Sequence, residues 1–94
     1  MIHVLAYDIA ADGRRARFFK RLKRLMVPVQ ESVFEGDLSG ARLTELERHI
    51  GRELDLRADA VRLYPLCRSC RGLVRTYGVS PDLWDGHAPL IIGP

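Results

Sequence analysis

Residues 2–26 read IHVLAYDIAADGRRARFFKRLKRLM, a stretch in which an apolar run gives way to a strongly basic one. If residues 2–8 are extended, successive side chains point to opposite sides, and both sides are mostly apolar. This pattern is typical of a strand in the middle of a covered sheet, so we expect one here. The following residues, 10–13, are predicted to form a loop with Asp12 as a possible helix cap.

A helix is predicted to follow, because its apolar residues share one side. At about 100° per residue they fall within an arc of about 120°, the width of a stripe that faces a core. These residues are Phe18, Phe19, Leu22, Leu25 and Met26. Most cations fall on the other side. Arg15 is the exception, since the same count places its guanidinium near the end of the strand, where Asp8 lies.

Positive charge is concentrated in this helix. Residues 14–24 contain five Arg and two Lys, and no Asp or Glu occurs between Gly13 and Gln30. The whole chain of 94 residues carries a formal net charge of only +3, so the remainder is net negative. A concentrated cationic surface indicates a polyanion partner. The alternative is a solvated charged face, but such faces mix Glu with Lys, so the lack of acids favours phosphate contact, for which Arg is well suited.

The rest of the pattern predicts the fold class. Residues 29–35 look extended, as one long strand or two short ones, and a second helix is expected from about Gly40 to Leu54. A strand follows at residues 61–66, and residues 73–77 are a candidate for one more. This order predicts an α+β ferredoxin-like βαββαβ plait with an additional C-terminal strand, in which the helices cover one face of a mainly antiparallel sheet.

Length and composition suggest one small domain, residues 1–78, followed by a tail, residues 79–94. The tail ends in Leu90-Ile91-Ile92, which would be exposed unless it adds a strand to a sheet edge of this subunit or of a neighbour. A homodimer is expected, because a small domain buries a limited share of its surface. We expect a cytoplasmic protein, since no apolar run of about 18 residues and no signal-peptide pattern occurs.

Asp8 is the first candidate for chemistry. A carboxylate at the end of a buried strand, beside a basic helix, is suited to hold Mg²⁺ against a phosphate, because Mg²⁺ takes one or two carboxylates together with waters and substrate phosphates. A two-fold axis near Asp8 would supply a second carboxylate. A structural ion pair between Asp8 and Arg15 is the competing interpretation.

Cys67 and Cys70 have the spacing of half a zinc site. A structural zinc site needs four ligands, and the other soft candidates are His3, His49 and His87. Three interpretations stay open for the two thiols: free structural cysteines, a metal site shared across a dimer, and a redox pair.

Other catalytic patterns are missing from the sequence. It contains no Ser-His-Asp arrangement, no glycine-rich phosphate loop and no His-x-x-x-His spacing, so acyl transfer, P-loop nucleotide hydrolysis and zinc proteolysis are unsupported. Among enzymes, phosphodiester cleavage remains.

Four motifs together resemble one family. They are Tyr7-Asp8-Ile9, Arg14-Arg15, Val29-Gln30-x-Ser32-Val33-Phe34-Glu35 and Val61-Arg62-Leu63-Tyr64-Pro65-Leu66. In this order, over about residues 2–77, the sequence resembles the small CRISPR-associated Cas-two proteins. The resemblance implies a ferredoxin-like homodimer in which Asp8 faces its symmetry mate and binds Mg²⁺, and in which the two carboxylates position the metal for cleavage of RNA or DNA.

The resemblance also implies roles for the neighbouring residues. The catalytic cleft would contain Asp8, Tyr7, Arg15, Ser32 and Phe34, and Arg17 matches a position beside it. The nucleic-acid contacts would come from Arg14, Arg17, Lys20, Arg21 and Arg24. A second implied role is non-catalytic: a scaffold in spacer acquisition that bridges copies of the integrase partner, usually called Cas-one, on a spacer precursor duplex. Phosphate contacts do not tell RNA from DNA, so the substrate stays open.

Overall fold

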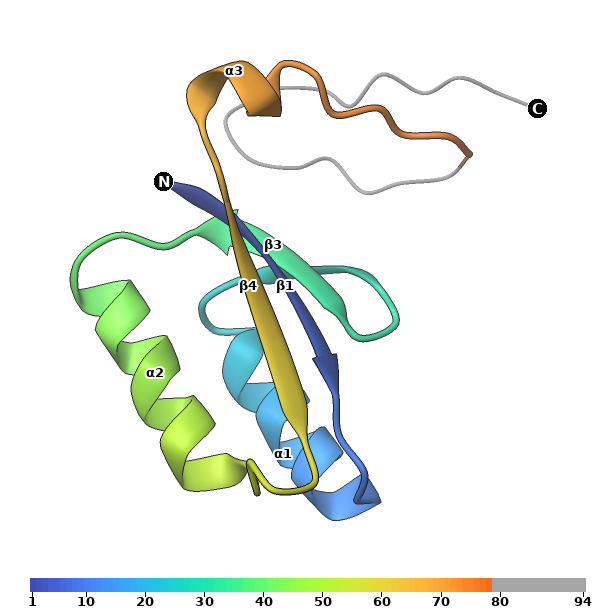
Figure 1. Cartoon of the computed structure of the whole chain (residues 1–94), viewed down its shortest axis with the longest axis vertical. Helices are drawn as coiled ribbons and strands as arrows, with labels where there is room; N and C mark the ends of the chain where they lie inside the picture. Colours follow the sequence, from blue (N-terminus) through green and yellow to red (C-terminus); the bar gives the residue numbers. More distant parts are fainter. Residues whose placement is uncertain (79–94) are drawn as a thin grey trace.

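A four-stranded antiparallel sheet and two long helices form the fold, which the computed structural model of the chain describes for residues 1–78 (Figure 1). The strands lie in the order β2-β3-β1-β4, and every neighbouring pair is antiparallel. The elements are β1 (Ile2–Asp8), α1 (Asp12–Leu22), β2 (Val27–Gln30), β3 (Val33–Asp37), α2 (Ala41–Glu53), β4 (Ala60–Leu66) and the short α3 (Arg68–Arg71). The predicted ferredoxin-like βαββαβ plait is therefore confirmed.

β1 is a central strand, as its two apolar sides predicted. It pairs with β3 along one edge and with β4 along the other. Leu5, which lies opposite Phe34 on one neighbour and Leu63 on the other, is fully buried. Because side chains alternate along a strand, Leu5 and Tyr7 face the helices, whereas Val4, Ala6 and Asp8 lie on the opposite face. We call that opposite side the open face of the sheet.

α1 packs on the sheet through Phe18 and Leu22, both fully buried. Leu25 and Met26 lie beyond the end of the helix and are also buried, whereas Phe19 keeps 36% of its surface exposed. The prediction of Asp12 as the cap is wrong, because Ala11 occupies the N-cap position and makes no side-chain bond there. The carboxylate of Asp12 instead pairs with Arg15 one turn later.

The extended segment that follows α1 consists of two strands. β2 and β3 are joined by a tight turn in which Ser32 takes the left-handed conformation, with φ at 64°. The pairing is irregular between Pro28 and Gln30. Proline lacks a backbone N–H, and β2 lies at the edge of this sheet, where a missing donor is tolerated.

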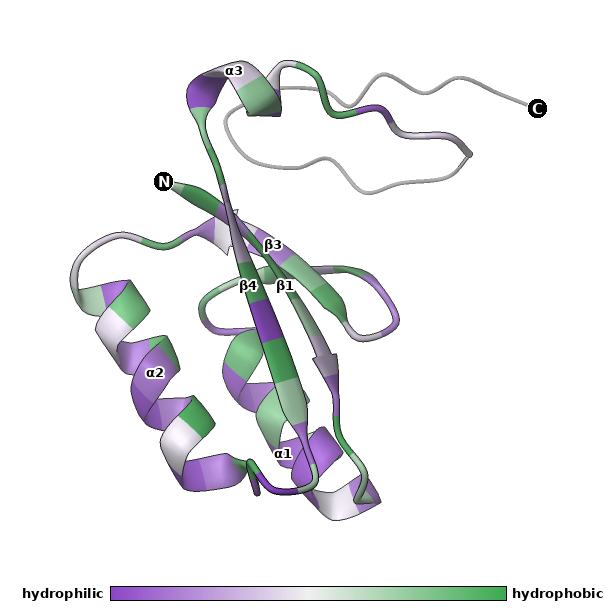
Figure 2. Cartoon of the chain, in the orientation of Figure 1, coloured by the Kyte–Doolittle hydropathy of each residue, from purple (hydrophilic) through white to green (hydrophobic). Residues whose placement is uncertain are grey.

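α2 covers the rest of the sheet, with bounds close to the predicted ones. Leu46 is fully buried, and Leu43 and Ile50 pack on the core from the same stripe. Hydrophobic and hydrophilic residues are mixed along both long helices, as expected for helices with one apolar stripe (Figure 2). No helix within residues 1–78 is both long and apolar enough to cross a membrane.

The predicted strand at residues 73–77 is wrong. This segment holds a single bridge residue, Thr76, and the chain first forms the four-residue helix α3. The cause is local: the sulfur of Cys67 accepts a hydrogen bond from the backbone N–H of Cys70, which turns the chain away from the sheet directly after Leu66. The strand predicted in the tail lies outside the residues that the structure describes.

Candidate nucleic-acid interface

Asp8 ends β1 on the open face of the sheet, and its side chain is exposed. Within residues 1–78 its carboxylate has no hydrogen bond and no ion pair. Arg15, the expected structural partner, is engaged elsewhere: its Nη1 donates to the carbonyl oxygen of Ile9 at 2.9 Å, and its Nη2 pairs with Asp12. The interpretation of Asp8 as one half of a structural ion pair with Arg15 is therefore not supported, and the carboxylate is available to a ligand.

Ser32 and Tyr7 hold the end of β1 in place. The backbone N–H of Tyr7 donates to the carbonyl oxygen of Ser32 at 3.1 Å, across the turn between β2 and β3. Burial raises the pKa of the Tyr7 phenol, and a hydrogen bond with the Ser32 side chain partly offsets this. The negative charge of Glu31, a residue that the sequence analysis did not single out, also raises the pKa of Tyr7. The Tyr7 hydroxyl therefore remains protonated at neutral pH.

Tyr7 and Phe34 lie in the core behind Asp8. The Tyr7 ring meets Phe18 edge to face with centroids 5.5 Å apart, and it lies 6.2 Å from the ring of Phe34. Phe34 is fully buried. Of the residues predicted for the catalytic cleft, the structure thus brings Asp8, Tyr7, Arg15 and Ser32 to one end of the sheet. Phe34 packs behind them in the core and exposes no surface to a substrate.

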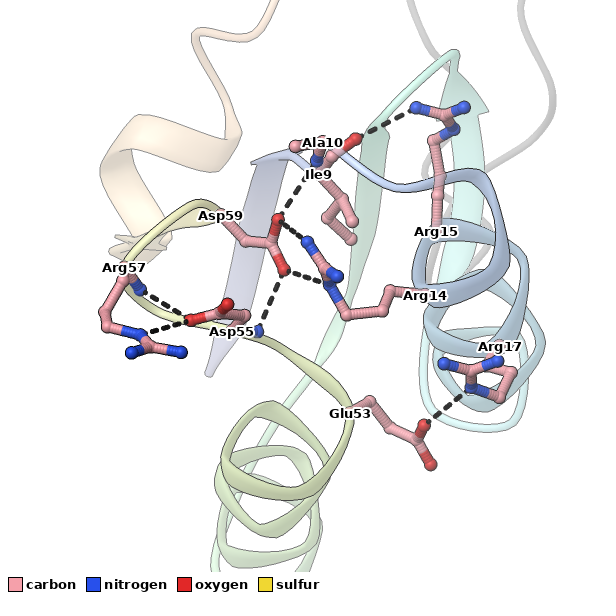
Figure 3. A network of polar contacts seen from close by, with 9 residues as sticks. All are labelled: Ile9, Ala10, Arg14, Arg15, Arg17, Glu53, Asp55, Arg57 and Asp59. Atoms are coloured by element: carbon pink, nitrogen blue, oxygen red, sulfur yellow. Dashed lines mark hydrogen bonds and ion pairs between the residues drawn. The ribbon is translucent and has the colours of Figure 1, made fainter.

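Arg14 takes part in a buried network that the sequence did not indicate (Figure 3). Its Nε and Nη2 donate to the two carboxylate oxygens of Asp59 at 2.8 and 3.0 Å. The same carboxylate, fully buried, also accepts the backbone N–H groups of Ala10 and Asp55. The Arg14 guanidinium holds the pKa of Asp59 well below its usual range, against the raising effect of burial. Arg14, in the first turn of α1, therefore joins this helix to the loop before β4, and its charge is committed to Asp59.

The remaining cations of the basic segment form a surface of α1 and the residues just after it. We call Arg17, Lys20, Arg21, Lys23 and Arg24 the cationic surface. The expectation that no acid offsets it is wrong, because α2 supplies one: Glu53 lies 3.4 Å from Nε of Arg17 and 3.6 Å from Nε of Arg21. A sequence window cannot contain this carboxylate, since it comes from a distant part of the chain.

The two arginines that face Glu53 still have guanidinium surface to offer. The Arg17 and Arg21 side chains are 61% and 42% exposed, and exposed ion pairs contribute about 0–1 kcal/mol, so a phosphate can compete for them. Lys20 and Arg24 are exposed and take part in no ion pair within residues 1–78. Lys23 lies 5.3 Å from the centre of the Phe19 ring. The cationic surface can therefore bind a phosphate chain, mainly through Lys20 and Arg24.

The donor set at Asp8 fits one mode of Mg²⁺ binding. Residues 1–78 contain no group of three or more His, Cys, Asp or Glu side chains that could enclose a metal ion. Mg²⁺ does not need such a cage, because it is usually bound through one or two carboxylates, with waters and substrate phosphates completing its six ligands. The free, exposed carboxylate of Asp8 can supply one such ligand.

Known proteins resemble this chain in sequence over most of its length. The model of the family described as CRISPR associated protein Cas2 matches residues 1–74. A Synechocystis protein named CRISPR-associated endoribonuclease Cas2 2 is 40% identical over 95% of this chain and 96% of its own. A Thermus thermophilus protein named CRISPR-associated endonuclease Cas2 2 is 41% identical over 85% of this chain and 84% of its own.

A solved structure supports the fold. The crystal structure of a hypothetical protein from Thermus thermophilus superimposes with a TM-score of 0.76 at 41% identity, and the match covers 85% of this chain and 93% of the other. The motifs, the plait and the relatives therefore agree, and the chain belongs to the Cas2 family, whose Cas-two motifs its sequence carries.

Proposed function

We propose that the chain is a nucleic-acid-binding homodimer of the CRISPR spacer-acquisition machinery, and that it cleaves phosphodiester bonds with Mg²⁺ held at Asp8. The observation that carries the proposal is the Asp8 carboxylate, exposed at the end of β1 and without an ion-pair partner within residues 1–78. The names of the relatives, which include an endoribonuclease and an endonuclease, support the same activity.

A second copy of the chain would complete the site. One carboxylate is few for a metal site, and a two-fold axis across the open face of the sheet would bring a second Asp8 to the first. The open face suits such packing, since the helices leave it uncovered and Val4 and Ala6 lie on it, half-buried. The proposed homodimer thus joins two half-sites into one.

Each group then has a defined task. Mg²⁺, when bound, supplies a more acidic water and offsets the charge that develops on the phosphate. Lys20 and Arg24 grip the sugar-phosphate chain, and Arg17 and Arg21 exchange Glu53 for phosphate oxygens. Ser32 and Tyr7 act as positioning residues, because they fix the backbone that carries Asp8.

A scaffold without cleavage is the second candidate. It is favoured by the cationic surface, which lies on the helix side of the molecule and needs no metal to hold a duplex. In this role the dimer would bridge copies of a Cas-one integrase on a spacer precursor, and Asp8 would be dispensable for binding.

The experiment that separates the two candidates compares wild type with Asp8→Asn on labelled RNA and DNA, with Mg²⁺ or with EDTA. The proposal predicts cleavage of at least one substrate by wild type with Mg²⁺ only, none by Asp8→Asn, and equal binding by both. Glu47→Gln is the matched control, because it removes one exposed carboxylate from α2 and should cleave like wild type. Wild type that binds but never cleaves would establish the scaffold instead.

A further inference from the structure

Two exposed cysteines lie where β4 leaves the sheet. Cys67 and Cys70 are both free and both exposed, so neither contributes to the hydrophobic core. Cys67 precedes α3 in an extended conformation, and Cys70 is the third residue of that helix. The two thiols are free, as one of the three interpretations of this pair expects, but their exposure gives them no role in core packing.

The two sulfur groups are arranged for reaction with each other. The Cys67 sulfur lies 3.3 Å from the backbone nitrogen of Cys70 and accepts its N–H. That hydrogen bond, together with one from the Cys70 thiol, lowers the pKa of Cys67, and the same contact raises the pKa of Cys70. Cys67 is thus the better thiolate at neutral pH, and Cys70 is a thiol held next to it.

We propose that Cys67 and Cys70 are a thiol–disulfide site, which small disulfides such as glutathione disulfide convert into an intramolecular disulfide. A zinc half-site is the competing use of this spacing. Within residues 1–78, however, no third His, Cys, Asp or Glu joins the two sulfurs to make a metal-binding group. Within that part of the chain, the pair is complete for disulfide chemistry and incomplete for a structural metal site.

The reaction balances with glutathione disulfide as the oxidant. The Cys67 thiolate attacks one sulfur of glutathione disulfide, a protein–glutathione bond forms, and the first glutathione leaves as a thiolate. Cys70 then gives up its proton to solvent and attacks the Cys67 sulfur, which releases the second glutathione. The protein loses two protons and two electrons; glutathione disulfide takes up the two electrons and leaves as two glutathione thiolates, which are protonated from solvent.

The site is separate from the proposed active site. Ala60, at the start of β4, lies opposite Asp8, whereas α3 follows Leu66 at the other end of the same strand (Figure 1). Along β4 this separation is about 20 Å, at about 3.3 Å per residue. Changes at the two cysteines therefore leave the surroundings of Asp8 untouched, and the inference stands or fails independently of the proposed function.

The test uses the full chain, reduced and then exposed to buffers of increasing glutathione disulfide to glutathione ratio, with free thiols trapped by alkylation before mass spectrometry. Wild type should lose both alkylation sites in one step and show the mass of the reduced chain less two hydrogens. Cys70→Ser should stop at one bound glutathione on Cys67, because the second attack is removed. Cys70→Ser should keep the wild-type unfolding temperature, since this side chain is exposed.

Three results would overturn the inference. The first is wild type that keeps both thiols across the whole range of ratios. The second is wild type that stops at a glutathione adduct, as Cys70→Ser should. The third is zinc that copurifies with wild type at one ion per two chains, protects both thiols and is lost in Cys67→Ser.

Discussion

The salt dependence of binding is the sharpest test of the cationic surface. Lys20→Gln combined with Arg24→Gln removes two exposed cations that have no ion pair within residues 1–78. Each phosphate contact to duplex DNA contributes about 0.9 to the slope of log affinity against log salt, so losing two contacts should make the slope shallower by about 1.8. At about 0.1 M salt the same two contacts correspond to a loss of roughly 60-fold in affinity.

The double substitution should weaken the binding of single-stranded nucleic acid less. Its contribution is about 0.7 per phosphate, which predicts a slope change of about 1.4 and a loss of roughly 25-fold under the same conditions. These slope changes and affinity losses apply to each copy of the chain that contacts the nucleic acid. The assay is fluorescence anisotropy with a labelled duplex and a labelled single strand, repeated at several salt concentrations.

A matched variant removes the effect of net charge alone. Arg48→Gln combined with Arg75→Gln also removes two exposed cations, one from α2 and one from the segment after α3. If the contacts are local to the cationic surface, this control keeps most of the wild-type slope. An equal loss of slope in both double variants would refute the argument, because binding would then depend on total charge and not on the cationic surface.

Three further predictions concern the acids. Glu53→Gln releases Arg17 and Arg21, so it should tighten nucleic-acid binding by roughly 2–5-fold in the same assay, and weaker binding would contradict the assigned pairs. Asp59→Asn should lower the unfolding temperature at neutral pH. Because folding lowers the pKa of Asp59, wild type should lose the stability that this carboxylate contributes as the pH falls below about 4, and Asp59→Asn should not show this loss. Glu35 has a buried side-chain oxygen without a hydrogen bond within residues 1–78, and burial raises its pKa. The free energy of unfolding of wild type should therefore fall as the pH rises past about 4.5. Urea unfolding of Glu35→Gln should not show this fall.

Much of the fold follows from local patterns in the sequence. The two apolar sides of residues 2–8 predicted a central strand, and the stripe that includes Leu46 predicted α2 with nearly the right bounds. Periodicity is a local property, so a single window contains it. The alternation of β1 also holds a signal that was not used: Tyr7 shares its side with Leu5, which indicates a place in the core, whereas Asp8 falls on the other face.

The errors arose where distant residues meet. Asp59 lies 45 positions from Arg14 in the chain, and nothing in either local pattern pairs them. The carboxylate of Glu53 offsets part of the positive charge of α1, whose basic segment contains no acid. After β4, the hydrogen bond to the Cys67 sulfur begins α3, and residues 73–77, which were predicted as a strand, hold a single bridge residue. Each of these depends on tertiary contacts or on a side chain that bonds the backbone.

In the proposed site, Asp8 holds the metal and two copies of the chain share it. Mn²⁺, which replaces Mg²⁺ in many oxygen-ligand sites, makes this measurable by electron paramagnetic resonance of the purified chain with a short nucleic-acid strand. The account predicts one bound Mn²⁺ per two chains in wild type and none in Asp8→Asn, with the Glu47→Gln control unchanged. Bound Mn²⁺ that persists in Asp8→Asn, or wild type that binds none, would contradict it.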